Sequence, residues 1–118
     1  MWLSRTSTAV GAKTTLTFQG EAVEIYGSTG QLNSQFDVSV DGGANITLDS
    51  FYDEARPSVL LWSANSLGDV PHKLEITNRP KSASQNKLVL DYALVRGASQ
   101  PTASIRYPLL LDTSPLIF

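Results

Sequence analysis

Apolar and polar residues alternate with a two-residue period along most of this chain, and this period restricts the fold more than any other feature. In the stretch TTLTFQG, Leu16 and Phe18 alternate with threonines, and in HKLEITN, Leu74 and Ile76 alternate with lysine and glutamate. Successive side chains of a β-strand point to opposite faces, so each stretch predicts a strand with one buried face. No window of helical length has apolar residues at positions i, i+3, i+4 and i+7.

About seven such segments follow one another, with turn signals roughly 8–12 residues apart. The clearest is the hairpin SQFDVSVDGGANITLDS, in which the DGG sequence at 41–43 supplies the positive φ angles of a tight turn. We expect Phe36 and Val38 to face the core, with Ile46 and Leu48 of the returning strand on the same face. Short strands at this spacing predict an all-β fold, an antiparallel β-sandwich.

Two segments depart from simple alternation. SVLLWSA, residues 58–64, is almost continuously apolar and predicts a strand buried on both sides. KLVLDYALV, residues 87–95, has Asp91 on what strict alternation makes a largely apolar face of a central strand. An unpaired carboxylate there would be costly. We therefore predict that Asp91 is a structural carboxylate held by loop N–H groups, Arg79, Arg96 or a cation, with a metal-binding or ligand-binding role as the alternative.

The length and the last residues predict one domain followed by a tail. A chain of 118 residues is long enough for one hydrophobic core and too short for two. We assign residues 1–96 to the β-sandwich and residues 97–118, which prolines interrupt, to a tail that adds an edge strand or serves as a linker. Because RYPLLLDTSPLIF is strongly apolar, we expect this end to pack along the sandwich or to pair with another copy of the chain.

Composition excludes several classes of function. A net charge of −2 with only 17% charged residues excludes the basic surface of a nucleic-acid-binding protein. Without cysteine there is no disulfide and no thiolate metal site. No segment approaches the ~20 apolar residues of a membrane span, so we expect no membrane insertion. The sequon Asn45-Ile46-Thr47 makes Asn45 a glycosylation candidate and favours an extracellular or cell-surface domain, excised from a larger protein.

Several short motifs occur in a fixed order. They are T-F-x-G at 17–20, Tyr-Gly at 26–27, V-x-V-D-G-G at 38–43, a glycine followed by H-x-L-x-I-T-N at 68–78, and L-D-Y-A-x-V at 90–95. Over roughly residues 14–96 this pattern resembles the jelly-roll ectodomains of fungal membrane-anchored proteins, which share the galactose-binding-like architecture of carbohydrate-binding modules. The resemblance implies a jelly-roll fold and a glycan ligand. It also implies that a structural calcium ion, which similar modules often carry, is an alternative to a metal-free domain.

The residues themselves do not predict a metal site. Calcium needs about 6–8 convergent oxygen ligands, whereas Asp41, Asp49 and Asp53 are scattered without D-x-D-x-D spacing. Zinc needs more imidazole or thiolate ligands than the single histidine, His72, can supply. We therefore predict no metal site and no cofactor, with calcium as the alternative.

Catalytic patterns are also missing from the sequence. His72 has no neighbouring acid or nucleophile that would make it a catalytic base, and no G-x-S-x-G nucleophile elbow occurs. Asp53 and Glu54 are adjacent, so on a strand they would point in opposite directions rather than flank a sugar. We predict that the chain is not an enzyme and that His72 has a structural role.

Aromatic rings next to polar side chains are the best candidates for ligand contacts. Tyr52 lies in a predicted loop beside Asp53 and Arg56, and Trp62 follows in the next strand. We predict that these four residues bind a glycan by ring stacking and hydrogen bonding, with a core position as the alternative for Trp62. The chain would then be a non-catalytic carbohydrate-binding module. The alternatives are a structural or adhesive ectodomain that contacts protein, and an accessory domain of a glycoside hydrolase.

Overall fold

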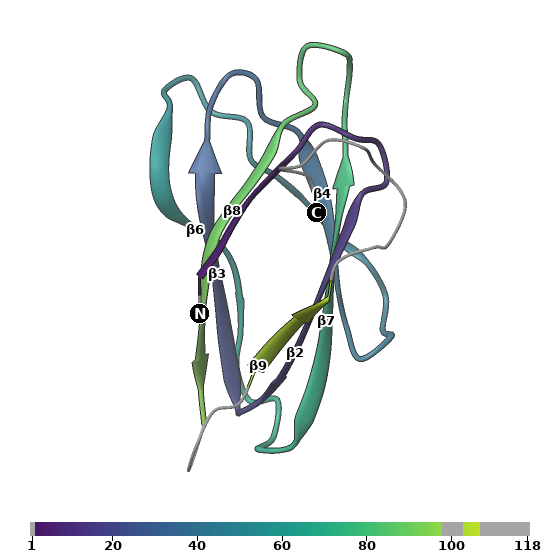
Figure 1. The fold of residues 1–118 in the computed structure, drawn as a ribbon, viewed down its shortest axis with the longest axis vertical. Coiled ribbons are helices and arrows are strands. Elements are labelled where there is room, and N and C mark those ends of the chain that lie inside the picture. The colour runs from purple at the N-terminus through teal and green to yellow at the C-terminus, as the bar shows by residue number, and fades with distance from the viewer. Residues whose placement is uncertain (1, 98–102, 107–118) are drawn as a thin grey trace.

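The computed structural model of the chain describes residues 2–97 and 103–106. These residues form nine β-strands in two facing layers, with no helix among them (Figure 1). The four-stranded sheet has the order β1 (Trp2–Ser7), β8 (Leu88–Arg96), β3 (Ala22–Thr29) and β6 (Arg56–Ala64). The five-stranded sheet has the order β5 (Ile46–Asp49), β4 (Gln35–Val40), β7 (Pro71–Arg79), β2 (Lys13–Gln19) and β9 (Ala103–Arg106).

All neighbouring strands are antiparallel, which confirms the predicted all-β architecture. Two strands, β1 and β9, were not among the seven segments that the alternation predicts. Strand β9 lies at the edge of the five-stranded sheet, where it pairs with β2. The apolar end that we expect to pack on the sandwich or on another copy begins at Arg106, and its remaining residues, 107–118, lie outside the described part of the chain. Within the described part, no helix is long and apolar enough to cross a membrane.

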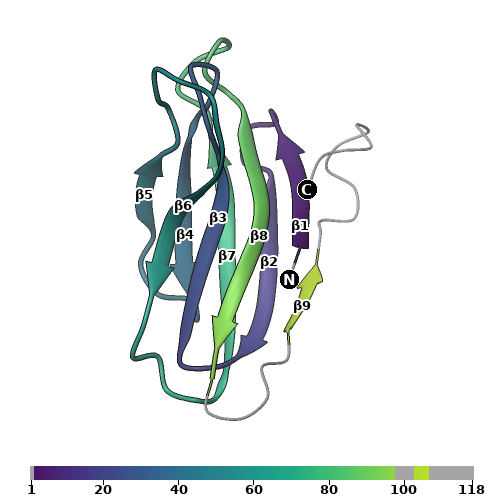
Figure 2. The same ribbon diagram turned by 90° about the vertical axis from the view of Figure 1, so that its left-hand side faces the viewer.

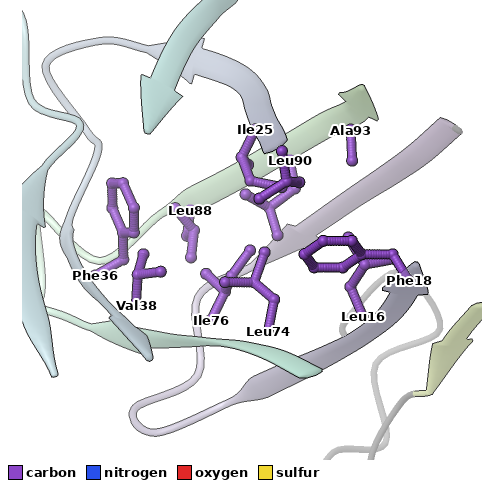
Figure 3. Close-up of a cluster of buried hydrophobic side chains, with 11 residues drawn as sticks. Leu16, Phe18, Ile25, Phe36, Val38, Leu74, Ile76, Leu88, Leu90 and Ala93 are labelled. Carbon is purple, nitrogen blue, oxygen red and sulfur yellow. The ribbon is translucent and has the colours of Figure 1, made fainter. Parts of the chain in front are cut away.

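The hydrophobic core fills the space between the two sheets (Figure 3). Leu16, Phe18, Leu74 and Ile76 each expose 3% or less of their surface, as the alternation predicts. Burying one large apolar side chain contributes about 1.5–3 kcal/mol to folding, so these residues are the main source of stability. The remaining core residues come from the strands of both sheets: Val23, Ile25, Phe36, Val38, Leu88, Leu90 and Ala93.

The DGG hairpin forms the predicted tight turn. Asp41 and Gly42 have positive φ angles of 53° and 73°, and the Gly43 N–H donates to the Val40 carbonyl at 2.9 Å. Val38 pairs with Ile46 and Phe36 with Leu48, so the returning strand has its apolar side chains on the predicted face. Leu48 packs against the core, but Ile46 is 52% exposed because it begins β5, which has no described strand on its outer side.

Strand β6 is also an edge strand, so the prediction that SVLLWSA is buried on both sides is wrong. Figure 2 shows β6 beside β3, and in the order of the described strands β6 is the last strand of its sheet. Leu60 is 50% exposed, whereas Leu61 and Trp62 pack against the core and remain partly accessible. A continuous apolar run resembles a central strand in sequence, but here one face covers the core and the other is an exposed apolar surface.

Strand β8 contains a β-bulge at Asp91. In the ladder with β3, Tyr26 pairs with Tyr92 and Gly27 pairs with Leu90, so Asp91 has no partner in β3. The ladder with β1 shifts its register at the same place. An extra residue in one strand reverses the inward and outward positions that follow it.

The bulge overturns the face assignment made from strict alternation. Leu90 is buried and so is Ala93, three residues later. Tyr92 and Leu94, which strict alternation places with Leu90 in the core, lie on the outer face instead. Asp91 therefore does not share an apolar face with Ala93, because it occupies the irregular position between the two halves of the strand.

Gly27 is needed where β3 approaches the bulge. A Cβ atom at this position would clash with the Val89 carbonyl oxygen and would lie 2.6 Å from Leu61 Cδ1. The first of these atoms belongs to the backbone of β8 and cannot rotate away. Only glycine allows the two strands to come this close.

We predict that Gly27→Ala lowers the free energy of unfolding by about 3 kcal/mol because the new methyl group forces β3 and β8 apart. Gly42→Ala is the matched control: its Cβ would meet no atom within 4 Å, and it should lose only the ~1 kcal/mol of its positive φ. Urea unfolding of both variants measures the difference. Equal losses would contradict the proposed close contact.

Candidate functional site

Three loops meet at one end of the molecule, after β3, after β5 and before β8. Backbone hydrogen bonds join them. Tyr52 N–H donates to the Gly30 carbonyl at 3.0 Å, Ser50 N–H to the Ser34 carbonyl at 3.0 Å, and Ser34 N–H to the Lys87 carbonyl at 2.8 Å. The loops therefore form one connected unit rather than three independent segments.

A buried polar network lies beneath these loops. Asn78, which is fully buried at the end of β7, accepts a 2.5 Å hydrogen bond from Ser34 Oγ. Its amide nitrogen donates to the carbonyl oxygens of Asn86 at 3.1 Å and Ser7 at 3.3 Å. Ser50 Oγ donates to the Ser34 carbonyl at 2.7 Å. A satisfied network of this kind holds its members in one arrangement, so it gives the loops a rigid base.

A groove of about 380 Å³ opens where these loops meet the outer face of the four-stranded sheet. In Figure 2 this sheet faces the reader. The groove is lined by strand residues and by loop residues. The strand residues are Thr6, Ser28, Thr29, Arg56, Pro57 and Val89, and the loop residues are 30–33, Ala55 and Lys87. The lining combines hydroxyl and amide groups with two cations and a few apolar surfaces, a mixture suited to a small polar ligand.

Three of the four predicted ligand-binding residues lie together at the rim of this groove. Tyr52 is 46% exposed, and the Arg56 guanidinium lies 5.1 Å from the centre of its ring. Arg56 also pairs with Glu54 at 3.1 Å. The Asp53 carbonyl accepts a 2.9 Å hydrogen bond from Gln31 Nε2, which joins the two loops of the rim.

Trp62 does not join this group. Its backbone pairs with Ile25, whose side chain is in the core, and the Trp62 ring packs against the same core. The predicted glycosylation site, Asn45, is exposed and follows the DGG turn between β4 and β5. Because β4 begins at the groove loops and ends at this turn, Asn45 lies at the opposite end of the molecule from the groove.

Asp91 stabilises the start of β6, next to the groove. Its Oδ2 accepts hydrogen bonds from Ser58 N–H at 3.0 Å and Ser58 Oγ at 3.3 Å. Ser58 has a φ of 55°, a conformation that residues other than glycine rarely adopt. Of the predicted partners, Arg79 instead pairs with Asp37 and Arg96 with Glu24. The carboxylate therefore anchors the strand that carries Arg56.

The bulge creates an aromatic surface that the alternation of the sequence did not predict. Tyr26 and Tyr92 stack on the outer face of the four-stranded sheet, with ring centres 4.6 Å apart and an angle of 13° between the rings. Leu60 and Leu94 beside them are 50% and 40% exposed. Burial, followed by the charge of Glu24, raises the pKa of Tyr26, so its hydroxyl stays protonated at neutral pH. We call these four side chains, Tyr26, Leu60, Tyr92 and Leu94, the outer shelf.

His72 lies at the end of the molecule opposite the groove and is only 7% exposed. Its Nδ1 lies 2.6 Å from Asp41 Oδ2, and its Nε2 lies 2.8 Å from the Gly68 carbonyl. Both partners are acceptors, so this geometry favours the imidazolium form, in which both ring nitrogens donate. In that form the ring has no free lone pair and cannot act as a base. His72 instead ties together β7, the DGG turn and the loop that contains Gly68.

The two groups of this pair have pKa values shifted in opposite directions. The hydrogen bond to the Gly68 carbonyl, followed by that to Asp41, raises the pKa of His72. Burial would raise the pKa of Asp41, but hydrogen bonds from His72 and from the Lys73 N–H outweigh it and lower this pKa. Each shift favours the charged form, so both groups stabilise the fold while they are charged.

No group of three or more His, Cys, Asp or Glu residues converges into a metal site within residues 2–97 and 103–106. Two of the three candidate calcium ligands have other partners. Asp41 binds His72, and Asp49 pairs with Lys81 at 2.7 Å.

The His72–Asp41 pair predicts a pH-dependent stability. Because the folded-state pKa of His72 is raised, its contribution is complete below about pH 6.5 and is lost as the pH rises through the folded-state pKa. Asp41 contributes above about pH 3.8 and loses its effect as the pH falls through its lowered pKa. We expect the free energy of unfolding to decrease as the pH rises above about 6.5 and through the raised folded-state pKa of His72.

Urea unfolding at a series of pH values measures this decrease. His72 is the only histidine of the chain, so the decrease should largely disappear in His72→Gln. A wild-type stability that stays constant or rises over this range would show that His72 is not a buried cation.

Asp91 allows a second test. Asp91→Ala removes both hydrogen bonds to Ser58 and should lower the free energy of unfolding by about 1–2 kcal/mol. Asp91→Asn keeps an acceptor oxygen and should lose less than half as much. If the two variants are equally unstable, the charge and not the hydrogen bonding determines the role of Asp91.

Comparison with known proteins does not assign a family. No protein-family model matches the chain, and no curated protein matches it.

Proposed function

We propose that this chain is a jelly-roll domain that binds carbohydrate and has no catalytic activity. The strand pairing supports the jelly-roll part of the proposal. Strands β1 to β4 pair in order with β8, β7, β6 and β5. A ribbon of four strand pairs that rolls up into two facing sheets has the arrangement of a jelly roll, and β9 adds one more strand at an edge.

The groove with its aromatic rim is the observation that carries the binding function. Sugar rings have apolar faces that stack on aromatic side chains and hydroxyls that need hydrogen-bonding groups. Tyr52 offers a partly exposed ring with the Arg56 guanidinium over one of its faces, and in this proposal the sugar stacks on the exposed part of the ring. The hydroxyl groups of Thr6 and Ser28 line the groove below. Because hydrogen bonds fix the loops beforehand, little ordering is required on binding.

The lining of the groove also supports a role without catalysis. Glycoside hydrolysis uses two carboxyl groups on either side of the scissile bond. Among the described residues that line the groove, none is an aspartate or a glutamate. At the rim, Glu54 is paired with Arg56. Binding by stacking and hydrogen bonding requires no cofactor.

We place the proposed function at the outer side of a cell. The exposed position of Asn45 in a turn supports this, since a sequon must be accessible to accept a glycan. Asn45 and the groove lie at opposite ends of the molecule, so a glycan on Asn45 would leave the groove open. An accessory domain of a glycoside hydrolase would use the same groove in the same way.

The outer shelf favours a second function, a structural or adhesive ectodomain that contacts another protein. Leu60 and Leu94 are exposed beside two tyrosines, and next to them the outer edge of β6 pairs with no strand of the described residues. Exposed apolar side chains and an open sheet edge are features of protein-binding surfaces. This surface is distinct from the rim of the groove, so the two functions can be tested separately.

Screening the purified chain on a glycan array, followed by affinity measurements on the best ligand, tests the proposal. We expect Tyr52→Ala to weaken binding at least about tenfold, or ~1.4 kcal/mol, because the sugar loses its stacking surface. Tyr92→Ala on the outer shelf is the matched control and should bind within about twofold of the wild type.

Two results would contradict the carbohydrate proposal: an array without any bound glycan, and equal losses in the two tyrosine variants. The protein-binding alternative would gain support from a protein contact that Leu60→Asp abolishes and Tyr52→Ala does not affect. Circular dichroism and thermal melting should confirm that each variant is folded.

A further inference from the structure

The charged side chains of the groove point to the class of sugar that it takes. Lys87 and Arg56 are the charged residues among the groove lining that the structure describes, and both are cations. A neutral sugar would leave this positive charge unused. We propose that the groove binds an acidic saccharide, whose anionic group pairs with Lys87. This inference rests on the proposed carbohydrate-binding function.

Lys87 is the cation that lacks a partner. Arg56 is already compensated by Glu54 at 3.1 Å and stacks on Tyr52. The side chain of Lys87 makes no hydrogen bond or ion pair with any described residue. Lys87 is a partly buried residue of the groove lining.

The backbone holds Lys87 firmly in the wall of the groove. Its N–H donates to the Leu32 carbonyl at 3.0 Å, and its own carbonyl accepts from Ser34 N–H at 2.8 Å. Next to it in the chain, Asn86 is tied to the fully buried Asn78. A cation on a fixed backbone can recognise an anion at one defined place, so it contributes specificity as well as attraction.

The carboxylates near the groove do not pair with Lys87. Asp91 accepts two hydrogen bonds from Ser58, and Glu54 is bound to Arg56. Asp53 is exposed at the rim and does not belong to the lining. A negative charge that pairs with Lys87 in the groove would therefore come from a ligand.

A second unpaired lysine provides an internal comparison. Lys73 likewise forms no side-chain ion pair with the described residues, but it is exposed on the outer face of the five-stranded sheet, away from the groove. Lys73→Gln changes the net charge of the chain by the same amount as Lys87→Gln. Comparing these two variants distinguishes recognition in the groove from general attraction between the protein and an anion.

Isothermal titration with three oligosaccharides of similar length tests the inference. They are an oligogalacturonate, its methyl ester, in which the same sugars carry no charge, and a sulfated oligosaccharide. At low salt we expect the wild type to bind at least one of the two anionic sugars about tenfold more tightly than the methyl ester. The preference should shrink at high salt because ions screen the pairing.

Preference for the oligogalacturonate would identify a carboxylate as the anionic group, and preference for the sulfated sugar would identify a sulfate. In either case, Lys87→Gln should reduce the preference to about twofold or less, and Lys73→Gln should keep it.

Other results would overturn the inference. Equal binding of charged and neutral sugars would do so and leave the carbohydrate function intact, provided that this binding still depends on Tyr52. Equal losses in Lys87→Gln and Lys73→Gln would show general attraction instead of a site. If none of the three sugars binds and the glycan array is also empty, both the inference and the carbohydrate function are wrong.

Discussion

The burial of one face of each sheet against the other is the interaction on which every other feature depends. Leu16 and Phe18 from one sheet meet Ile25 and Leu90 from the other, and all four are almost completely buried. This contact fixes which side of each strand points outward. The groove, the rim and the outer shelf consist of side chains that this packing leaves on the surface or in the loops. Without a shared core, none of them would have a defined position.

The bulge at Asp91 connects the core to the candidate site. The extra residue turns Tyr92 outward beside Tyr26 and keeps Ala93 in the core. Its carboxylate holds Ser58 at the start of β6, two residues after Arg56. One irregular position thus shapes the outer shelf and supports one wall of the groove. Bulges often have this effect of redirecting side chains near functional sites.

The two ends of the molecule use polar groups in different ways. At one end, His72 and Asp41 form a charged pair whose hydrogen bonds connect loops, so its polar atoms are occupied. At the other end, Asn78 satisfies buried polar groups beneath the loops that form the groove. Lys87 lies at this second end. The charged pair that stabilises the fold and the proposed binding groove are therefore separated along the strands.

The sequence by itself determined the class of fold and most of the core, because a two-residue period fixes which side chains share a face of a strand. It also predicted the DGG turn and the proximity of Tyr52, Asp53 and Arg56, which are close in the chain. It failed at Asp91 because a bulge has no periodic signal, and at residues 58–64 because a run of apolar residues does not reveal a sheet edge. Only the tertiary structure placed Lys87 beside residues 30–33 and 55–57, since hydrogen bonds between distant loops bring them together.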